Sequence, residues 1–152
     1  MSPRLNPYEA APGIMEPLVA LENALRESGL ELGLFHLVKT RASQLNGCAY
    51  CIHMHTRDAR RHGETEERLY LLDAWRDSSL YTPRELAALA WTEAVTRVAE
   101  SRVPDAVYAE LRREFSEAEI VKLTVLVGTI NTWNRIAVSF RTPHPTTSQR
   151  HA

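Results

Sequence analysis

The sequence predicts an all-α protein of about six to seven helices. Apolar residues recur at intervals of three and four along most of the chain, which is the spacing of one helix face. Capping boxes at Thr82–Glu85 and Ser116–Glu119 mark two helix starts. Apolar and polar residues rarely alternate at period two, and neither a hairpin signal nor an internal repeat is visible. We therefore expect packed helices without a sheet.

The first half of the chain contains an arm and four helical patterns. Residues 1–13 hold three prolines and Gly13, and we expect this arm to be irregular. A glycine follows each of the first three helical patterns, where it can end a helix. The four patterns run from Leu18 to Gly29, from Leu34 to Asn46-Gly47, from Cys48 to His62-Gly63, and from Glu66 to Arg76.

The second half contains three predicted helices and a tail. The capping box at Thr82 opens a helix to about Glu100, and Pro104 opens a shorter one that reaches Glu114. The last helix follows Ser116 and is apolar on almost every face between residues 120 and 130. Such a segment must be covered on all sides, in the core or at a subunit interface, which predicts a homo-oligomer. Residues 141–152 predict a loose tail.

Composition excludes several classes of protein. A chain of 152 residues with 44% hydrophobic content suits one domain, 1–152. A formal net charge of −1 gives no field to recruit nucleic acid or an anionic membrane. No apolar run reaches the roughly 18 residues of a membrane span, and the start of the chain lacks a signal-peptide segment. We expect a cytoplasmic protein whose two cysteines serve redox chemistry or metal binding.

The segment from Cys48 to His55 carries this chemistry. Cys48 and Cys51 are three residues apart, and His55 lies four residues after Cys51, so one helix would place all three on one face. The positive end of the helix dipole favours a thiolate near the helix start. The imidazole can take the proton of the Cys51 thiol or stabilise the thiolate, and the second thiol can capture a sulfenic acid. The trio thus supplies a nucleophile, a resolving group and a base.

Two other interpretations of this segment stay open. The cysteines can be plain core residues beside an exposed histidine. Alternatively, Cys48, Cys51 and His55 can bind a tetrahedral zinc ion with His36 from the preceding helix as the fourth ligand. Against zinc, no second close pair of ligands is present, as structural zinc sites usually have.

The segment Arg41–His55 resembles the alkylhydroperoxidase D-like (AhpD-like) branch of the carboxymuconolactone decarboxylase superfamily. Residues 90–96 and 130–135 resemble the same branch, and the resemblance covers about residues 15–140. It implies a helical fold that assembles into trimers or hexamers. It also implies a thiol-dependent alkylhydroperoxidase or thiol–disulfide oxidoreductase, with a hydroperoxide substrate, no bound cofactor, and an external dithiol donor such as dihydrolipoamide.

The resemblance also implies roles for the residues of the motif. Cys51 corresponds to the peroxide-attacking cysteine, Cys48 to the resolving cysteine, and His55 to the histidine of a proton relay. The helix dipole alone would favour Cys48 as the more acidic thiol. Family members that lack the cysteines decarboxylate lactones, and the cysteines present here argue against that chemistry.

One departure from the family pattern concerns the base of the relay. The family usually has a glutamate 12 residues before the first cysteine, where this chain has His36 (48 − 12 = 36). An imidazole can act as a base near neutral pH, but it can also retune or weaken the relay, bind a metal, or simply pack. If activity is lost, a non-enzymatic oligomeric protein remains. Glu93 lies on an apolar stripe and could replace the missing glutamate, or it could pair with Arg97.

Overall fold

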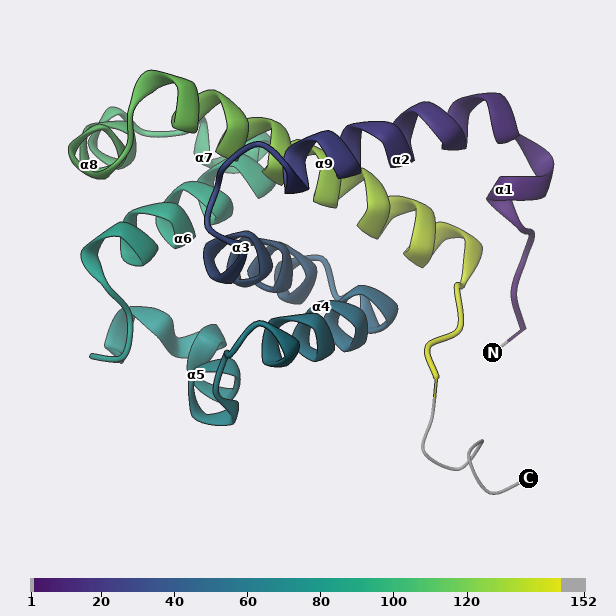
Figure 1. Ribbon diagram of the computed structural model, residues 1–152, viewed down its shortest axis with the longest axis horizontal. Helices are drawn as coiled ribbons and strands as arrows, with labels where there is room; N and C mark the ends of the chain where they lie inside the picture. The colour runs from purple at the N-terminus through teal and green to yellow at the C-terminus, as the bar shows by residue number, and fades with distance from the viewer. Residues whose placement is uncertain (1, 146–152) are drawn as a thin grey trace.

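The computed structural model describes residues 2–145, which form nine α-helices and one 3₁₀ helix with no strand among them (Figure 1). The predicted all-α class is confirmed. The helices are α1 (Pro7–Ala10), α2 (Pro12–Arg26), α3 (Leu32–Leu45), α4 (Ala49–Arg61), α5 (Glu66–Leu71), η1 (Leu72–Asp77), α6 (Pro83–Thr96), α7 (Val98–Ser101), α8 (Asp105–Glu114) and α9 (Glu117–Phe140).

The prediction of an irregular N-terminal arm holds for residues 2–6 and is wrong from Pro7 onward. Pro7 and Pro12 are the first residues of α1 and α2, where proline is favoured because its missing N–H has no helical partner. Asn6 caps α1 by accepting a hydrogen bond from the backbone N–H of Tyr8 at 3.1 Å. The backbone N–H of Arg4 donates to the carbonyl of Phe140 at 3.0 Å, so the arm lies against the end of α9.

The helix count was too low because α1 forms in the predicted arm and because two predicted helices are broken. The segment 66–76 changes from α-helix to 3₁₀ helix after Leu71, and Ala74 has non-helical backbone angles. The helix predicted to reach Glu100 stops at Thr96, and α7 follows after Arg97. Both predicted capping boxes are present, at Thr82 and Ser116. The part of the predicted tail from residue 146 onward lies outside the described residues.

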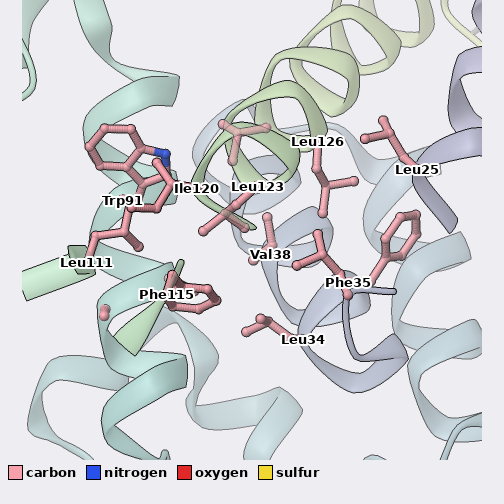
Figure 2. Packing of buried hydrophobic residues seen from close by; sticks show 14 residues of the cluster. Leu25, Leu34, Phe35, Val38, Trp91, Leu111, Phe115, Ile120, Leu123 and Leu126 are labelled. Atoms are coloured by element: carbon pink, nitrogen blue, oxygen red, sulfur yellow. The ribbon is translucent and has the colours of Figure 1, made fainter. Parts of the chain in front are cut away.

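The centre of the fold is α3, which packs against α4, α6 and α9 (Figure 1). All ten residues from 34 to 43 are buried, so this helix is covered on every face. Figure 2 shows Leu34, Phe35 and Val38 of α3 facing Leu123 and Leu126 of α9. Burial of such side chains contributes roughly 1.5–3 kcal/mol each, relative to leaving them in water.

One face of α9 is exposed to solvent in the single chain, although the sequence predicts that residues 120–130 are covered on all sides. Leu123, Val127 and Ile130 are fully buried, whereas Val121 is 62% exposed and Val125 is 38% exposed.

No helix within residues 2–145 has both the length and the apolar character needed to cross a bilayer.

Candidate active site

A tight turn between α3 and α4 positions the cysteine pair. Gly47 adopts a left-handed conformation with φ of 63°, which glycine reaches without steric cost. The backbone N–H of Cys48 then donates to the carbonyl of Ser43 at 3.0 Å. Cys48 becomes the N-cap of α4, and its Sγ accepts a hydrogen bond from the backbone N–H of Cys51 at 3.3 Å. The turn thus fixes both cysteines at the start of one helix.

The two sulfurs are joined in a disulfide. Their Cα atoms are 5.4 Å apart, as one helical turn requires, and each cysteine is only 1% exposed. Such a bond closes a loop of a few residues, so it adds little to stability by constraining the unfolded chain. As a structural cross-link, the pair therefore contributes little.

Asparagine side chains from α9 hold the turn in place. The amide nitrogen of Asn46 donates to the side-chain oxygens of Asn131 and Asn134, at 3.0 and 2.8 Å. Asn134 in turn donates to Ser43 Oγ at 3.0 Å, and Asn131 donates to Thr96 Oγ1 at 3.0 Å. These bonds connect the cysteine turn to α6 and α9. They give a structural role to the segments Arg41–His55 and 130–135, which contain the asparagines.

His55 and His36 lie side by side in the interior, with ring centroids 6.5 Å apart. They are 3% and 0% exposed, and their ring nitrogens have no hydrogen-bond partner within residues 2–145. Burial, followed by the charge of Lys39, lowers the pKa of His55 well below its usual value. Burial, followed by the charges of His62 and Arg26, lowers the pKa of His36 to about 4.

Both imidazoles are therefore neutral at pH 7. A neutral ring can accept a hydrogen bond from the Cys51 thiol, but it has no positive charge with which to stabilise a thiolate. His36 is further engaged in a stack with His62, at a centroid distance of 4.8 Å.

A largely buried ion pair that was not predicted from the sequence lies close to these groups. Lys39 on α3 pairs with Glu22 on α2, and their side chains are 2% and 14% exposed. Trp133 Nε1 donates to the second oxygen of Glu22 at 3.2 Å. A signal for Glu22 was present in the sequence, because it lies four residues after Leu18 and three before Leu25, on a predicted apolar stripe.

A cavity of about 440 Å³ brings these groups together. Cys51, His55, Lys39 and Glu22 all line it, whereas Cys48 does not. Most of the remaining wall is apolar, and the N-terminal arm covers part of it. The apolar side chains include Leu5, Val19, Met54, Trp133, Ile136 and Phe140. Of the cysteine pair, the cavity thus borders Cys51 alone, and its wall suits a ligand with apolar groups.

Glu93 lies in a different environment. Its carboxylate accepts hydrogen bonds from Arg41 Nε at 2.9 Å and Trp75 Nε1 at 2.8 Å, and it also pairs with Arg76. Burial raises the pKa of Glu93, but the hydrogen bonds from these three side chains outweigh burial and lower it. The partner is therefore not Arg97, and this carboxylate joins α6 to α3 and η1 rather than facing the cysteines.

The zinc interpretation gains no support from this geometry. No group of three or more His, Cys, Asp or Glu side chains within residues 2–145 is arranged to hold a metal ion.

Comparison with known proteins places the fold and the motif in one family. Residues 12–94 match the model of the carboxymuconolactone decarboxylase family. The chain belongs to this family. The chain is 42% identical over 139 residues to the uncharacterised protein YdfG of Bacillus subtilis, a match that covers 91% of this chain and 95% of YdfG.

Solved structures assign the chain to the AhpD-like branch. A protein of unknown function from Agrobacterium tumefaciens, assigned by inference to the antioxidant defence protein AhpD, matches with a TM-score of 0.93 and 48% identity over 95% of this chain and 99% of that one. A peroxidase-related protein with an AhpD core from Ralstonia eutropha matches with a TM-score of 0.80 over 93% and 75%. At 19% identity the second likeness concerns the fold alone. The AhpD-like resemblance of the sequence is confirmed.

Proposed function

We propose that this AhpD-like protein is a thiol-dependent hydroperoxide reductase with Cys51 as the attacking residue. The observation that carries the proposal is the asymmetry of the cysteine pair: Cys51 lines the cavity, and Cys48 lies one helical turn away, outside the cavity wall but within reach of the other sulfur. This asymmetry favours Cys51 as the attacking thiol, although the helix dipole alone favours Cys48.

The reaction begins when the Cys51 thiolate attacks the terminal oxygen of a hydroperoxide, ROOH. The O–O bond breaks, a sulfenic acid forms on Cys51, and the leaving alkoxide takes a proton to become the alcohol ROH. The sulfur is oxidised and the peroxide is reduced by two electrons. The apolar wall supports this step because it excludes bulk water from the reacting atoms.

The second step closes the disulfide. The Cys48 thiolate attacks the sulfenic sulfur of Cys51, the S–O bond breaks, and water leaves after protonation. The turn at Gly47 favours this step, because it already holds the two cysteines at the separation of a disulfide. An external dithiol such as dihydrolipoamide then reduces the disulfide. We place this cycle in the cytoplasm, with no bound cofactor.

Steady-state kinetics test the proposal. Wild-type protein with dihydrolipoamide should consume tert-butyl hydroperoxide, and Cys51→Ser should lose this activity because the attacking sulfur is gone. In a reaction without the dithiol, Cys48→Ser should reduce about one equivalent of peroxide and then stop with the sulfenic acid on Cys51, because nothing closes the disulfide. Peroxide loss at the same rate in wild type and Cys51→Ser would refute the proposed function.

A further inference from the structure

The cavity beside Cys51 contains a buried positive charge that neither histidine supplies. Lys39 is 2% exposed and lines the same cavity wall as Cys51 and His55. Arg26 also lines the cavity, but it is exposed, so solvent and salt screen its charge. After burial, the charge of Lys39 is the next cause of the lowered pKa of His55, so its field reaches the His55 side of the cavity that Cys51 also lines.

The ion pair of Lys39 with Glu22 is expensive to maintain in this position. Removing two charges from water is unfavourable, and their mutual attraction offsets this only partly. An apolar pair of similar volume would give comparable or greater stability. Charged groups that are retained in a cavity at such a cost are more typical of functional sites than of structural cores.

The hydrogen bonds of the pair leave the lysine partly free. Glu22 uses both oxygens, one for Lys39 and one for Trp133 Nε1. The Lys39 ammonium has three N–H donors, and Glu22 is its one acceptor within residues 2–145. Its Nζ lies 4.9 Å from the centroid of the Phe35 ring, which adds a favourable cation–π contact. Two N–H groups thus remain for an anionic sulfur or oxygen in the cavity.

The residue type at position 39 also supports a role in proton transfer. Lys39 is one of only two lysines in the chain, and arginine supplies every other permanent positive side-chain charge. An arginine holds its proton in proteins, whereas an ammonium can release one. Burial lowers the pKa of Lys39, and the neighbouring Glu22 offsets part of this effect, so the ammonium is a stronger acid than a lysine in water.

We propose that Lys39, held in the cavity by Glu22, stabilises the Cys51 thiolate and protonates the oxygen that leaves the hydroperoxide. The second half of this inference rests on the proposed function. The Cys51 sulfur forms its bond to the terminal peroxide oxygen, the O–O bond breaks, and the alkoxide takes a proton from Lys39 Nζ. The resulting amine regains its proton from water, so the step produces one sulfenic acid and one alcohol.

Other titratable groups around the site also contribute to any pH dependence that is measured. Tyr8 of α1, Arg26 of α2, and Tyr50 and Asp58 of α4 line the same cavity. Asp58 pairs with Arg57 and Arg61 at 3.2 and 3.5 Å. These groups stay constant when Lys39 and Glu22 are changed, so a difference between variants reports the ion pair.

The thiolate half is tested by alkylation, without any peroxide. In a Cys48→Ser background, the rate of Cys51 alkylation by iodoacetamide is followed from pH 5 to pH 10. Loss of the cation in Lys39→Met should raise the pKa of the Cys51 thiol and slow alkylation at pH 7 by about tenfold. Glu22→Gln should accelerate alkylation, because it removes a negative charge that opposes the thiolate.

Two further variants make this result decisive. Lys122→Met is the matched control, because it removes the other lysine, which donates to the carbonyl of Ser28 at 2.7 Å outside the cavity. If Lys39→Met fails to fold, the double variant Glu22→Gln/Lys39→Met removes both charges together and should slow alkylation relative to Glu22→Gln alone, because the two proteins differ only in the cation. Alkylation profiles of the Lys39 variants that match Lys122→Met would overturn the inference.

The proton-donor half is tested by Lys39→Arg, which keeps the charge but cannot release a proton. We expect near wild-type alkylation together with about a tenfold or greater loss of kcat for tert-butyl hydroperoxide. Unchanged kcat would overturn this half. If the wild-type protein does not consume peroxide at all, the proposed function and the proton-donor role both fail, while the alkylation series still decides whether Lys39 activates Cys51.

Discussion

The charge state of the two buried histidines is set by their surroundings rather than by their residue type. His36 and His55 lie among apolar side chains with positive neighbours, and both conditions disfavour a protonated ring. An imidazole at the position of the family glutamate therefore supplies no charge here. At the residue scale, the cation and the carboxylate of the site come instead from Lys39 and Glu22.

The lowered pKa of His36 predicts a pH-dependent stability. The pKa is about 4 in the folded chain and about 6.5 in the unfolded chain, so the unfolded chain binds more protons between these values. The free energy of unfolding should therefore fall as the pH drops from 6.5 to 4, by roughly 1–3 kcal/mol for this residue. His55 acts in the same direction.

Urea denaturation at pH 7 and pH 4.5 measures this effect. His36→Leu removes the titrating ring and should reduce the loss of stability between the two pH values. His144→Leu changes an exposed histidine and should behave as wild type. The same pH dependence in His36→Leu and wild type would contradict the assignment of His36 as a buried neutral ring.

At the scale of elements, local signals in the sequence identified most helices but not their partners. Both capping boxes and the helix that carries Cys51 and His55 were predicted from short-range spacing, and the structure has them. The role of Pro7 and Pro12 as first helical residues was missed, because proline also marks irregular chain. Glu93 pairs with Arg41 and Arg76 on other elements, and spacing along one helix cannot predict such partners.

The same reasoning explains why the ion pair of the site was missed. Glu22 and Lys39 come from α2 and α3, and α9 supplies Trp133, so the cluster exists only once three helices have packed. A charged residue among apolar ones marks Glu22 and Lys39 singly, but nothing in the sequence pairs the two. The Cys48–Cys51–His55 face, in contrast, needs only one helix, and this part of the site could be predicted.

The contact between α9 and the cysteine turn predicts a measurable coupling. Asn134→Ala removes the hydrogen bonds to Asn46 and Ser43 and leaves buried polar groups without partners. We expect the free energy of unfolding to fall by about 1–3 kcal/mol in urea titrations. Thr132→Ala on the exposed side of the same helix is the control and should change it by less than about 0.5 kcal/mol. Equal effects of both substitutions would contradict a role for α9 in holding the turn.

At the scale of the whole molecule, the open face of α9 favours self-association. Val121 and Val125 are exposed one helical turn apart on a helix that is otherwise the partner of α3. Exposed apolar side chains in a row are typical of interfaces between subunits. We therefore expect a homo-oligomer, a trimer or hexamer, with this face covered.

Light scattering tests this expectation. The wild-type mass should be a multiple of 17.2 kDa, and Val121→Glu should shift it toward the single chain by placing a charge in the interface. Tyr70→Glu changes a side chain that is 73% exposed on α5 and should leave the mass unchanged. A wild-type particle of 17.2 kDa would contradict the expectation.

The central claim, that Cys51 is the sulfur attacked by peroxide inside the cavity, is tested most directly by trapping the sulfenic acid. Reduced Cys48→Ser and Cys51→Ser proteins are each treated with one equivalent of tert-butyl hydroperoxide in the presence of dimedone, and the adduct is mapped by mass spectrometry. We predict a stoichiometric adduct on Cys51 in Cys48→Ser and none on Cys48 in Cys51→Ser. An adduct on Cys48, or no adduct in either protein, would contradict the account.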